Sequence, residues 1–299
     1  MEIVNAAKGV ILPNFEKKQL SAGLYFVATP IGAARDITLR GLDILASADA
    51  IAAEDTRTAK RLMEIHGIPL GDRPVISYHD HNGAQVRPRL MRLLEAGQSL
   101  AYVSEAGTPL VADPGYALGR AAIDAGIQVI GAPGPSAIIA ALTVAGLPTD
   151  RFFFAGFAPN AKGARRRFFE EFAEVPGTLV FYESPKRIHG MLGDLVQTLG
   201  GERQAAVCRE LTKRFEEVSR GTLTELVEAF DGRTVKGEIV VLVDRARVHA
   251  VSEQTMEDAL SDALKTMRIK DAATAVSEAL GIQRRKVYQA ALAMEKDKE

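Results

Sequence analysis

The chain has 299 residues, of which 47% are hydrophobic and 25% are charged, and its formal net charge at pH 7 is -1. Such a length has room for two domains, and the near-neutral charge excludes a global basic field, so any RNA contact must come from local patches. A single cysteine, Cys208, excludes intramolecular disulfides and a thiolate zinc site. No stretch has the order of a signal peptide or approaches about 18 apolar residues, so we expect a soluble, cytoplasmic protein.

Residues 1–22 are polar and aperiodic and predict a loose N-terminal arm. Over 23–147, short apolar runs alternate with amphipathic segments, which predicts an N-terminal α/β domain with a parallel sheet and helices on both faces. Asp36 is a plausible cap for the first helix. The predicted strands cover residues 24–28, 50–53, 75–77, 100–103 and 128–130.

A linker at 147–150 precedes a second α/β domain, which we assign to residues 148–246 and expect to contain a mixed sheet. Ser184-Pro185 has the pattern of a helix start. Residues 250–299 predict a helical, helix-turn-helix-like C-terminal unit, although a dimerisation or lid element is an equally common role for such a tail. Further strands are predicted from Phe152 onward and over 179–182, 205–208, 218–221 and 239–243.

Three loops rich in glycine and proline follow predicted strands of the first domain: TPIG at 29–32, EAGTP at 105–109 and PGPS at 133–136. The carboxyl ends of parallel strands meet at one edge of a sheet, where ligands bind. The loops carry no phosphate-binding lysine, and the dinucleotide, P-loop and nucleophile-elbow motifs are absent from the sequence. We therefore expect a ligand held by backbone groups and apolar walls, such as S-adenosyl-L-methionine.

Six stretches resemble the tetrapyrrole-methylase-type S-adenosylmethionine transferases: VATPIGAARDIT, AAEDTR, SEAGTPLVADPG, PGPSA, FYESPKR and RELTKRFEE. Within that superfamily they resemble the bacterial enzymes that 2′-O-methylate a cytidine of 16S ribosomal RNA. The resemblance covers residues 23–244. It implies two α/β domains with the cofactor in the cleft between them, a homodimer and an RNA-recognising helical C-terminus. We expect 16S ribosomal RNA as the partner, and both the 30S subunit and the free RNA are open as its form. Glu105 departs from the pattern, which usually has Asp there.

The loops and the resemblance together predict the cofactor site. Its expected residues are Thr29, Pro30, Gly32, Gly107, Thr108, Pro109, Val111, Ser136, Ala137, Tyr182 and Glu238. No metal is expected, because His79 and His81 have no third ligand at a suitable spacing.

Charged residues at strand ends are the candidates for catalysis. We predict Lys186 and Lys213 as bases or orienting groups, held by Glu183 and Glu210, with Asp55 facing them from the first domain. Desolvation in a closed cleft can lower the pKa of a lysine toward a useful value. The alternative is that these charges pair with one another and hold the domains together.

Local basic patches are the candidates for RNA contact: Arg57, Lys162, Arg165, Arg166, Arg167, Arg284, Arg285 and Lys286. The arginines at 165–167 lie beside Phe168 and Phe169, a combination that can grip phosphates and stack a base. We expect no acidic partner for these arginines. The alternative is a solvated helix face whose aromatic residues belong to the core.

Two other functions are compatible with the sequence. One is a methyltransferase of the same superfamily that acts on a tetrapyrrole or a diphthamide precursor. The other is a non-catalytic RNA-binding assembly factor that keeps the fold, although the intact cofactor loops argue against it.

Overall fold

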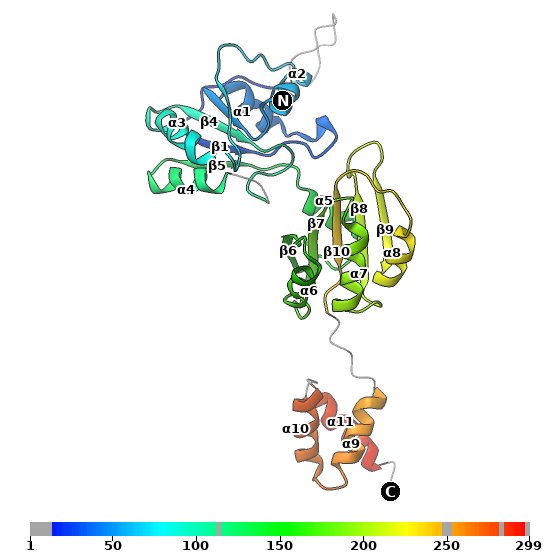
Figure 1. The fold of residues 1–299 in the computed structure, drawn as a ribbon. Helices are drawn as coiled ribbons and strands as arrows, with labels where there is room; N and C mark the ends of the chain where they lie inside the picture. The colour runs from blue at the N-terminus through cyan, green and yellow to red at the C-terminus, as the bar shows by residue number, and fades with distance from the viewer. Residues whose placement is uncertain (1–13, 112–114, 247–252, 281–283, 297–299) are drawn as a thin grey trace, which may run out of the picture. The chain divides into compact units, whose positions relative to one another are not determined.

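The computed structural model describes residues 14–111, 115–246, 253–280 and 284–296. It divides the chain into two compact units, Met1–Arg245 and Ala246–Glu299. Figure 1 shows that the first unit contains two sheets, whereas the described part of the second is helical. No helix in the described ranges combines the length and the apolar character that a membrane crossing needs.

The first sheet is parallel and has the strand order β3-β2-β4-β1-β5. Every residue of β1, β2 and β4 is buried, as expected for strands that have helices on both faces. The predicted parallel α/β arrangement is therefore confirmed. The strands are β1 (Gly23–Val27), β2 (Ala50–Ala53), β3 (Val75–Ser77), β4 (Ser99–Val103) and β5 (Val129–Ala132).

Alternate residues of these strands face two separate hydrophobic clusters. Val27, Ile51 and Val103 pack with helices α1 (Leu39–Ser47) and α2 (Thr56–Ile65). Phe26 and Tyr102 face the opposite side, where they pack with α3 (Gly83–Glu95) and α4 (Tyr116–Asp124). Because helices cover both faces of this sheet, ligands can approach it at the ends of its strands.

The second sheet is mixed, with the order β6-β7-β10-β8-β9. Strands β6 and β7 are parallel, and β10 runs antiparallel to β7 and β8. The helices α6 (Lys162–Glu170), α7 (Ile188–Leu199) and α8 (Leu223–Phe230) pack on one face. The strands are β6 (Phe152–Phe157), β7 (Thr178–Glu183), β8 (Gln204–Arg209), β9 (Glu217–Thr222) and β10 (Ile239–Val243).

Helix α5 (Ala137–Ala145) follows the last strand of the first sheet but packs on the second. Ile138, Ala141 and Leu142 form a cluster with Val180 of β7 and Val240 of β10. An almost wholly apolar helix needs such a face to bury its surface. The chain therefore crosses from one sheet to the other through α5 (Figure 1).

Two predicted helix starts are wrong. Thr38 caps α1, with its hydroxyl oxygen accepting a hydrogen bond from the Gly41 amide at 3.0 Å, whereas Asp36 lies in a preceding 3-10 turn. Helix α7 begins at Ile188, because Ser184 and the residues after it form a turn instead of the first helical turn.

The second unit contains α9 (Glu253–Ala263), α10 (Ile269–Leu280) and α11 (Arg284–Lys296). Met256, Leu260, Val276 and Val287 form its core. The predicted three-helix unit is confirmed, and α11 begins at Arg284, so the basic triplet lies at a helix start as expected.

Candidate functional site

A pocket of about 420 Å³ lies where the strand-end loops of the first sheet face the second sheet. Four carboxyl residues line it, and none of its described lining residues is Lys or Arg, so we name it the acidic pocket. Burial raises the pKa of Tyr182 to about 12 and that of Cys208 to about 11, so both side chains in its wall are neutral. The four carboxyl residues are Glu54, Glu105, Glu183 and Glu238.

The loops beside the acidic pocket are tied together by their backbones. Thr29 and Gly107 form an isolated antiparallel bridge, with the Thr29 amide donating to the Gly107 carbonyl at 2.9 Å and the Gly107 amide to the Thr29 carbonyl at 3.0 Å. The Thr108 hydroxyl donates to the Pro135 carbonyl at 2.8 Å. Gly107 has a φ of +82°, a conformation that favours glycine. The three loops thus form one rigid wall.

A second pocket, of about 480 Å³, lies on the first domain beside this wall. We name it the arginine pocket because Arg57 and Arg61 line it. Asp55 caps α2 and accepts hydrogen bonds from the Arg57 amide at 2.7 Å and from Arg57 Nη2 at 2.8 Å. The hydrogen bonds from Arg57 lower the pKa of Asp55 to about 2. Asp55 therefore orients Arg57 instead of serving as a free proton acceptor.

The predicted cofactor residues divide between these two pockets. Seven of them line the acidic pocket: Gly107, Thr108, Val111, Ser136, Ala137, Tyr182 and Glu238. Thr29, Pro30 and Gly32 line the arginine pocket instead, and Pro109 lines neither. Asp113 and Pro114, near the end of the SEAGTPLVADPG stretch, lie outside the described residues.

Some residues that line the acidic pocket were not predicted from the sequence. Glu105 lines both pockets, and Phe157 and Cys208 also line the acidic pocket. The position of Phe157 at the end of β6 could have identified it, because strand ends form the site. Cys208 lies within β8 and has no local signal.

Lys213 is held between two carboxylates. Its Nζ lies 2.9 Å from Glu210 Oε1 and 3.0 Å from Glu238 Oε2. Burial alone would lower the pKa of Lys213. The hydrogen bonds and charges of Glu210 and Glu238 outweigh this effect, so the pKa of Lys213 is raised above its ordinary value. The expected lowering of the Lys213 pKa by desolvation is therefore wrong, whereas Glu210 holds the amine as predicted.

The loop that carries Lys213 packs against the TPIG loop. The Thr212 hydroxyl oxygen accepts a hydrogen bond from the Ala33 amide at 3.0 Å. A Cβ at Gly32 would lie 2.6 Å from Lys213 Cγ, so the close approach needs glycine. Glu210 and Thr212 have φ values of +50° and +63°, an uncommon conformation for side chains of this kind. These contacts fix the TPIG loop from the side of the second sheet.

Glu183 holds Arg187 and not Lys186, contrary to the prediction. Its Oε1 lies 3.2 Å from Arg187 Nε, and Lys186 is exposed. Burial raises the pKa of Glu183 despite the Ser184 amide and the Arg187 charge. Arg187 also donates to the Ala158 and Pro159 carbonyls, the latter at 3.2 Å. The pair therefore anchors the segment that follows Phe157.

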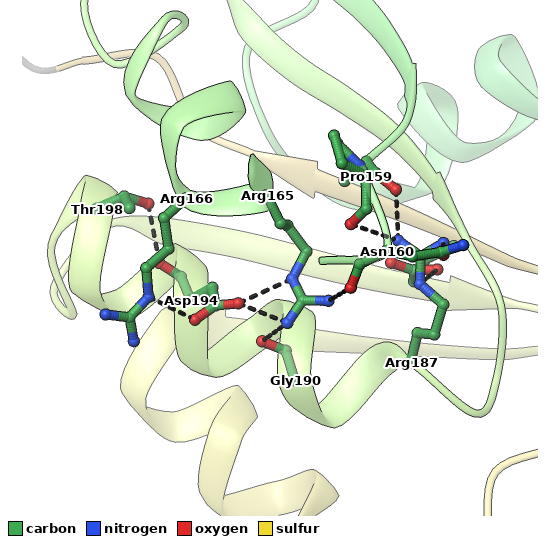
Figure 2. A network of polar contacts seen from close by, with 10 residues as sticks. Pro159, Asn160, Arg165, Arg166, Arg187, Gly190, Asp194 and Thr198 are labelled. Atoms are coloured by element: carbon green, nitrogen blue, oxygen red, sulfur yellow. Dashed lines mark hydrogen bonds and ion pairs between the residues drawn. The ribbon is translucent and has the colours of Figure 1, made fainter. Parts of the chain in front are cut away.

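The arginines of α6 do have an acidic partner, which corrects the sequence-based expectation. Figure 2 shows Asp194 of α7 between Arg165 and Arg166, with Arg165 Nη2 at 2.6 Å from Oδ2 and Arg166 Nε at 2.7 Å from Oδ1. Burial alone would raise the pKa of Asp194, but the two guanidinium groups outweigh it and lower the pKa. Arg165 is buried and does not offer a free cation to RNA.

The other basic residues differ in exposure. Lys162 and Arg167 of α6 are exposed. Phe169 of the same helix is fully buried, which favours the alternative that the aromatic residues belong to the core. In the C-terminal unit, Arg284 Nε donates to the Thr274 hydroxyl oxygen at 2.9 Å. Arg285 and Lys286 are exposed. Within the described ranges, no three His, Cys, Asp or Glu residues are grouped to hold a metal.

Comparisons with known proteins agree with this arrangement. Residues 23–227 match the family model of Tetrapyrrole (Corrin/Porphyrin) Methylases, and residues 250–295 match the RsmI C-terminal HTH domain. The chain is 46% identical over 273 residues to ribosomal RNA small subunit methyltransferase I of Mesorhizobium japonicum, covering 91% of this chain and 92% of that protein. The Mycobacterium tuberculosis protein of the same name is 43% identical, covering 91% and 95%.

Solved structures share the fold at low sequence identity. The methyltransferase CobJ is 20% identical with a TM-score of 0.58, covering 76% of this chain and 95% of its own. Diphthine synthase is 16% identical with a TM-score of 0.57, covering 74% and 89%. At such identities these likenesses concern the fold alone.

Removing the carboxylate between the two arginines tests its structural role. We expect Asp194→Asn to lower the free energy of unfolding by about 3–5 kcal/mol, because it leaves the buried Arg165 charge unpaired. Asp124→Asn, which breaks the exposed pair with Arg120, is the matched control and should change it by about 0.5 kcal/mol or less. Urea unfolding measures both, and equal effects would contradict the assignment.

Replacing Glu183 by glutamine tests the raised pKa of its carboxyl. The pKa of Glu183 is higher in the folded protein than in the unfolded chain. The contribution of Glu183 to the free energy of unfolding therefore falls as the pH rises from the unfolded-state pKa to the folded-state pKa. We therefore expect the free energy of unfolding of Glu183→Gln to increase relative to the wild type from about pH 4 to about pH 7. A difference that is constant or decreases over this range would show that the pKa is not raised.

Proposed function

Because the chain belongs to the ribosomal RNA small subunit methyltransferase I family of tetrapyrrole-type methylases, we propose that it transfers a methyl group from S-adenosyl-L-methionine to the ribose 2′-oxygen of a cytidine in 16S ribosomal RNA. The observation that carries the proposal is the acidic pocket beside the three tied loops, in a chain that matches these relatives over 91% of its length. We further propose that it acts in the cytoplasm as a homodimer on the 30S subunit.

The chemistry of the acidic pocket suits this cofactor. S-adenosylmethionine supplies a methyl group on a positively charged sulfur, and it carries an ammonium group as well. Four carboxyl residues and no described Lys or Arg line the pocket. Glu183 and Glu238 pair with Arg187 and Lys213 outside the lining, and Glu54 and Glu105 remain to favour a cation over an anion. Its volume of about 420 Å³ lies within the range of cofactor sites. Thr108 and Ser136 would contact the ligand at the loop side and Tyr182 at the sheet side.

The ribose hydroxyl loses a proton as its oxygen is methylated, so an acceptor must lie nearby. Lys213 is unsuited because its two carboxylate partners hold it protonated. We propose that Glu105, an exposed carboxylate that lines both pockets, accepts the proton. Lys213 would instead keep Glu238 in the wall of the acidic pocket, and we assign Lys186 no step in the reaction.

Exposed cations supply the proposed RNA surface. Lys162 and Arg167 of α6, and Arg285 and Lys286 at the start of α11, are the exposed members of the predicted basic patches. Phosphate contacts of this kind position an RNA without reading its sequence. Arg166 contributes less, because Asp194 neutralises it.

The experiment that tests the function offers radiolabelled S-adenosylmethionine together with 30S subunits, free 16S ribosomal RNA or small tetrapyrroles. We expect label in the RNA and its recovery as 2′-O-methylcytidine after digestion to nucleosides. Label in a tetrapyrrole, or on a base instead of the ribose, would overturn the proposal.

Substituting Gly107 tests the cofactor site. Gly107→Val introduces a side chain at a φ of +82°, where its Cβ would lie 3.3 Å from Ile31 Cγ2 in the wall of the acidic pocket. We expect calorimetry to show at least a tenfold loss of S-adenosylmethionine affinity.

The matched control is Gly97→Val. Gly97 has a φ of +80°, and a Cβ there would meet no atom within 4 Å. It imposes the same backbone strain away from both pockets and should keep wild-type affinity. Equal affinities of the two variants would remove the EAGTP loop from the cofactor site.

A further inference from the structure

The arginine pocket is separate from the acidic pocket and is not needed to hold the proposed cofactor. We propose that it binds the ribose-phosphate backbone of the RNA at the reacting nucleotide, with the Arg57 guanidinium on a phosphate. This inference rests on the proposed function and assigns the pocket that receives its substrate. Three independent features of the pocket support it.

The first feature is a pre-oriented cation. Asp55 holds Arg57 through Nε at 3.2 Å and Nη2 at 2.8 Å, and the Arg57 side chain is still 91% exposed. A guanidinium has five N–H donors. Two are directed at Asp55, so its other edge is left to face solvent with donors suited to phosphate oxygens. Because Asp55 has already fixed the side chain, binding a phosphate costs less side-chain entropy.

The second feature is the lining of the pocket. Ala59 and Leu62 of α2 form an apolar wall, which Ile65 extends toward solvent. Thr29 and Ser104 add buried hydroxyl groups, which donate their protons to the Gly107 carbonyl at 3.5 and 3.1 Å and so present only their oxygens as acceptors. An apolar wall, hydroxyl groups and a cation match the parts of a nucleotide: the faces of its rings, its sugar hydroxyls and its phosphate. The volume of about 480 Å³ is within the usual range for a small-molecule site.

The third feature is the connection between the two pockets. Glu105 lines both of them, and the Thr29–Gly107 bridge lies between them, with Thr29 on one side and Gly107 on the other. A ribose in the arginine pocket would therefore lie at the border of the cofactor site. Methyl transfer requires this proximity, because the attacking oxygen and the methyl carbon must meet.

Two substitutions test the pocket, each with a matched control. Arg57→Ala removes the cation, and Arg120→Ala removes another exposed, acid-paired arginine on α4. Thr58→Phe places a bulky group in the arginine pocket, and Thr143→Phe makes the same change at an exposed threonine of α5 that lines neither pocket. Steady-state methylation of 30S subunits and calorimetry with S-adenosylmethionine are measured for all four variants and the wild type.

We expect Arg57→Ala to raise the KM for RNA about tenfold, the effect of losing a charged hydrogen bond. It should also reduce the salt dependence of RNA binding by about 0.7–0.9 in log–log slope, the value for one phosphate contact. Thr58→Phe should reduce methylation at least tenfold. Both variants should bind the cofactor with wild-type affinity, and the two controls should behave as the wild type.

Wild-type KM and salt slope in Arg57→Ala, together with wild-type methylation by Thr58→Phe, would overturn the inference and leave the proposed function standing. An equal loss in the control variants would also overturn it, because the effect would then not belong to this pocket. Failure of the wild-type protein to methylate any RNA would instead refute the proposed function.

Discussion

The backbone bridge between Thr29 and Gly107 is the constraint on which the site depends. These residues follow β1 and β4, which are neighbours in the first sheet, and their two hydrogen bonds of 2.9 and 3.0 Å join the ends of the strands into one wall. A side chain at Gly107 would have to adopt a positive φ. Because the wall is built from backbone, its position depends little on side-chain rotamers. It separates the acidic pocket from the arginine pocket.

The second sheet braces this wall through charged groups that satisfy one another. Lys213, between Glu210 and Glu238, keeps the β8–β9 loop seated on the TPIG loop. On the opposite face of the sheet, Asp194 fastens α6 to α7 through two arginines (Figure 2). Buried charges of this kind are costly when one partner is removed. Much of the charge in the second domain is therefore structural, and only its exposed cations are available to RNA.

The parallel sheet was predictable because strands buried on both faces are continuous apolar runs, and the glycine-rich loops marked the functional edge. The local pair of Glu210 and Lys213 was predicted, but two other ion pairs were not predictable, because they join residues far apart in the sequence. Asp194 lies on a different helix from Arg165, and Glu238 meets Lys213 across the β10–β8 pairing. For the same reason the motifs did not predict that the loops divide between two pockets, although they did predict the loops themselves.

The most direct test of this account is a crystal structure of the protein with S-adenosylhomocysteine, the demethylated form of the proposed cofactor. The account predicts the ligand in the acidic pocket, in contact with Thr108, Ser136 and Tyr182, with the arginine pocket and the exposed edge of Arg57 left open. Ligand density in the arginine pocket, against Arg57 and Thr58, would contradict the assignment of both pockets.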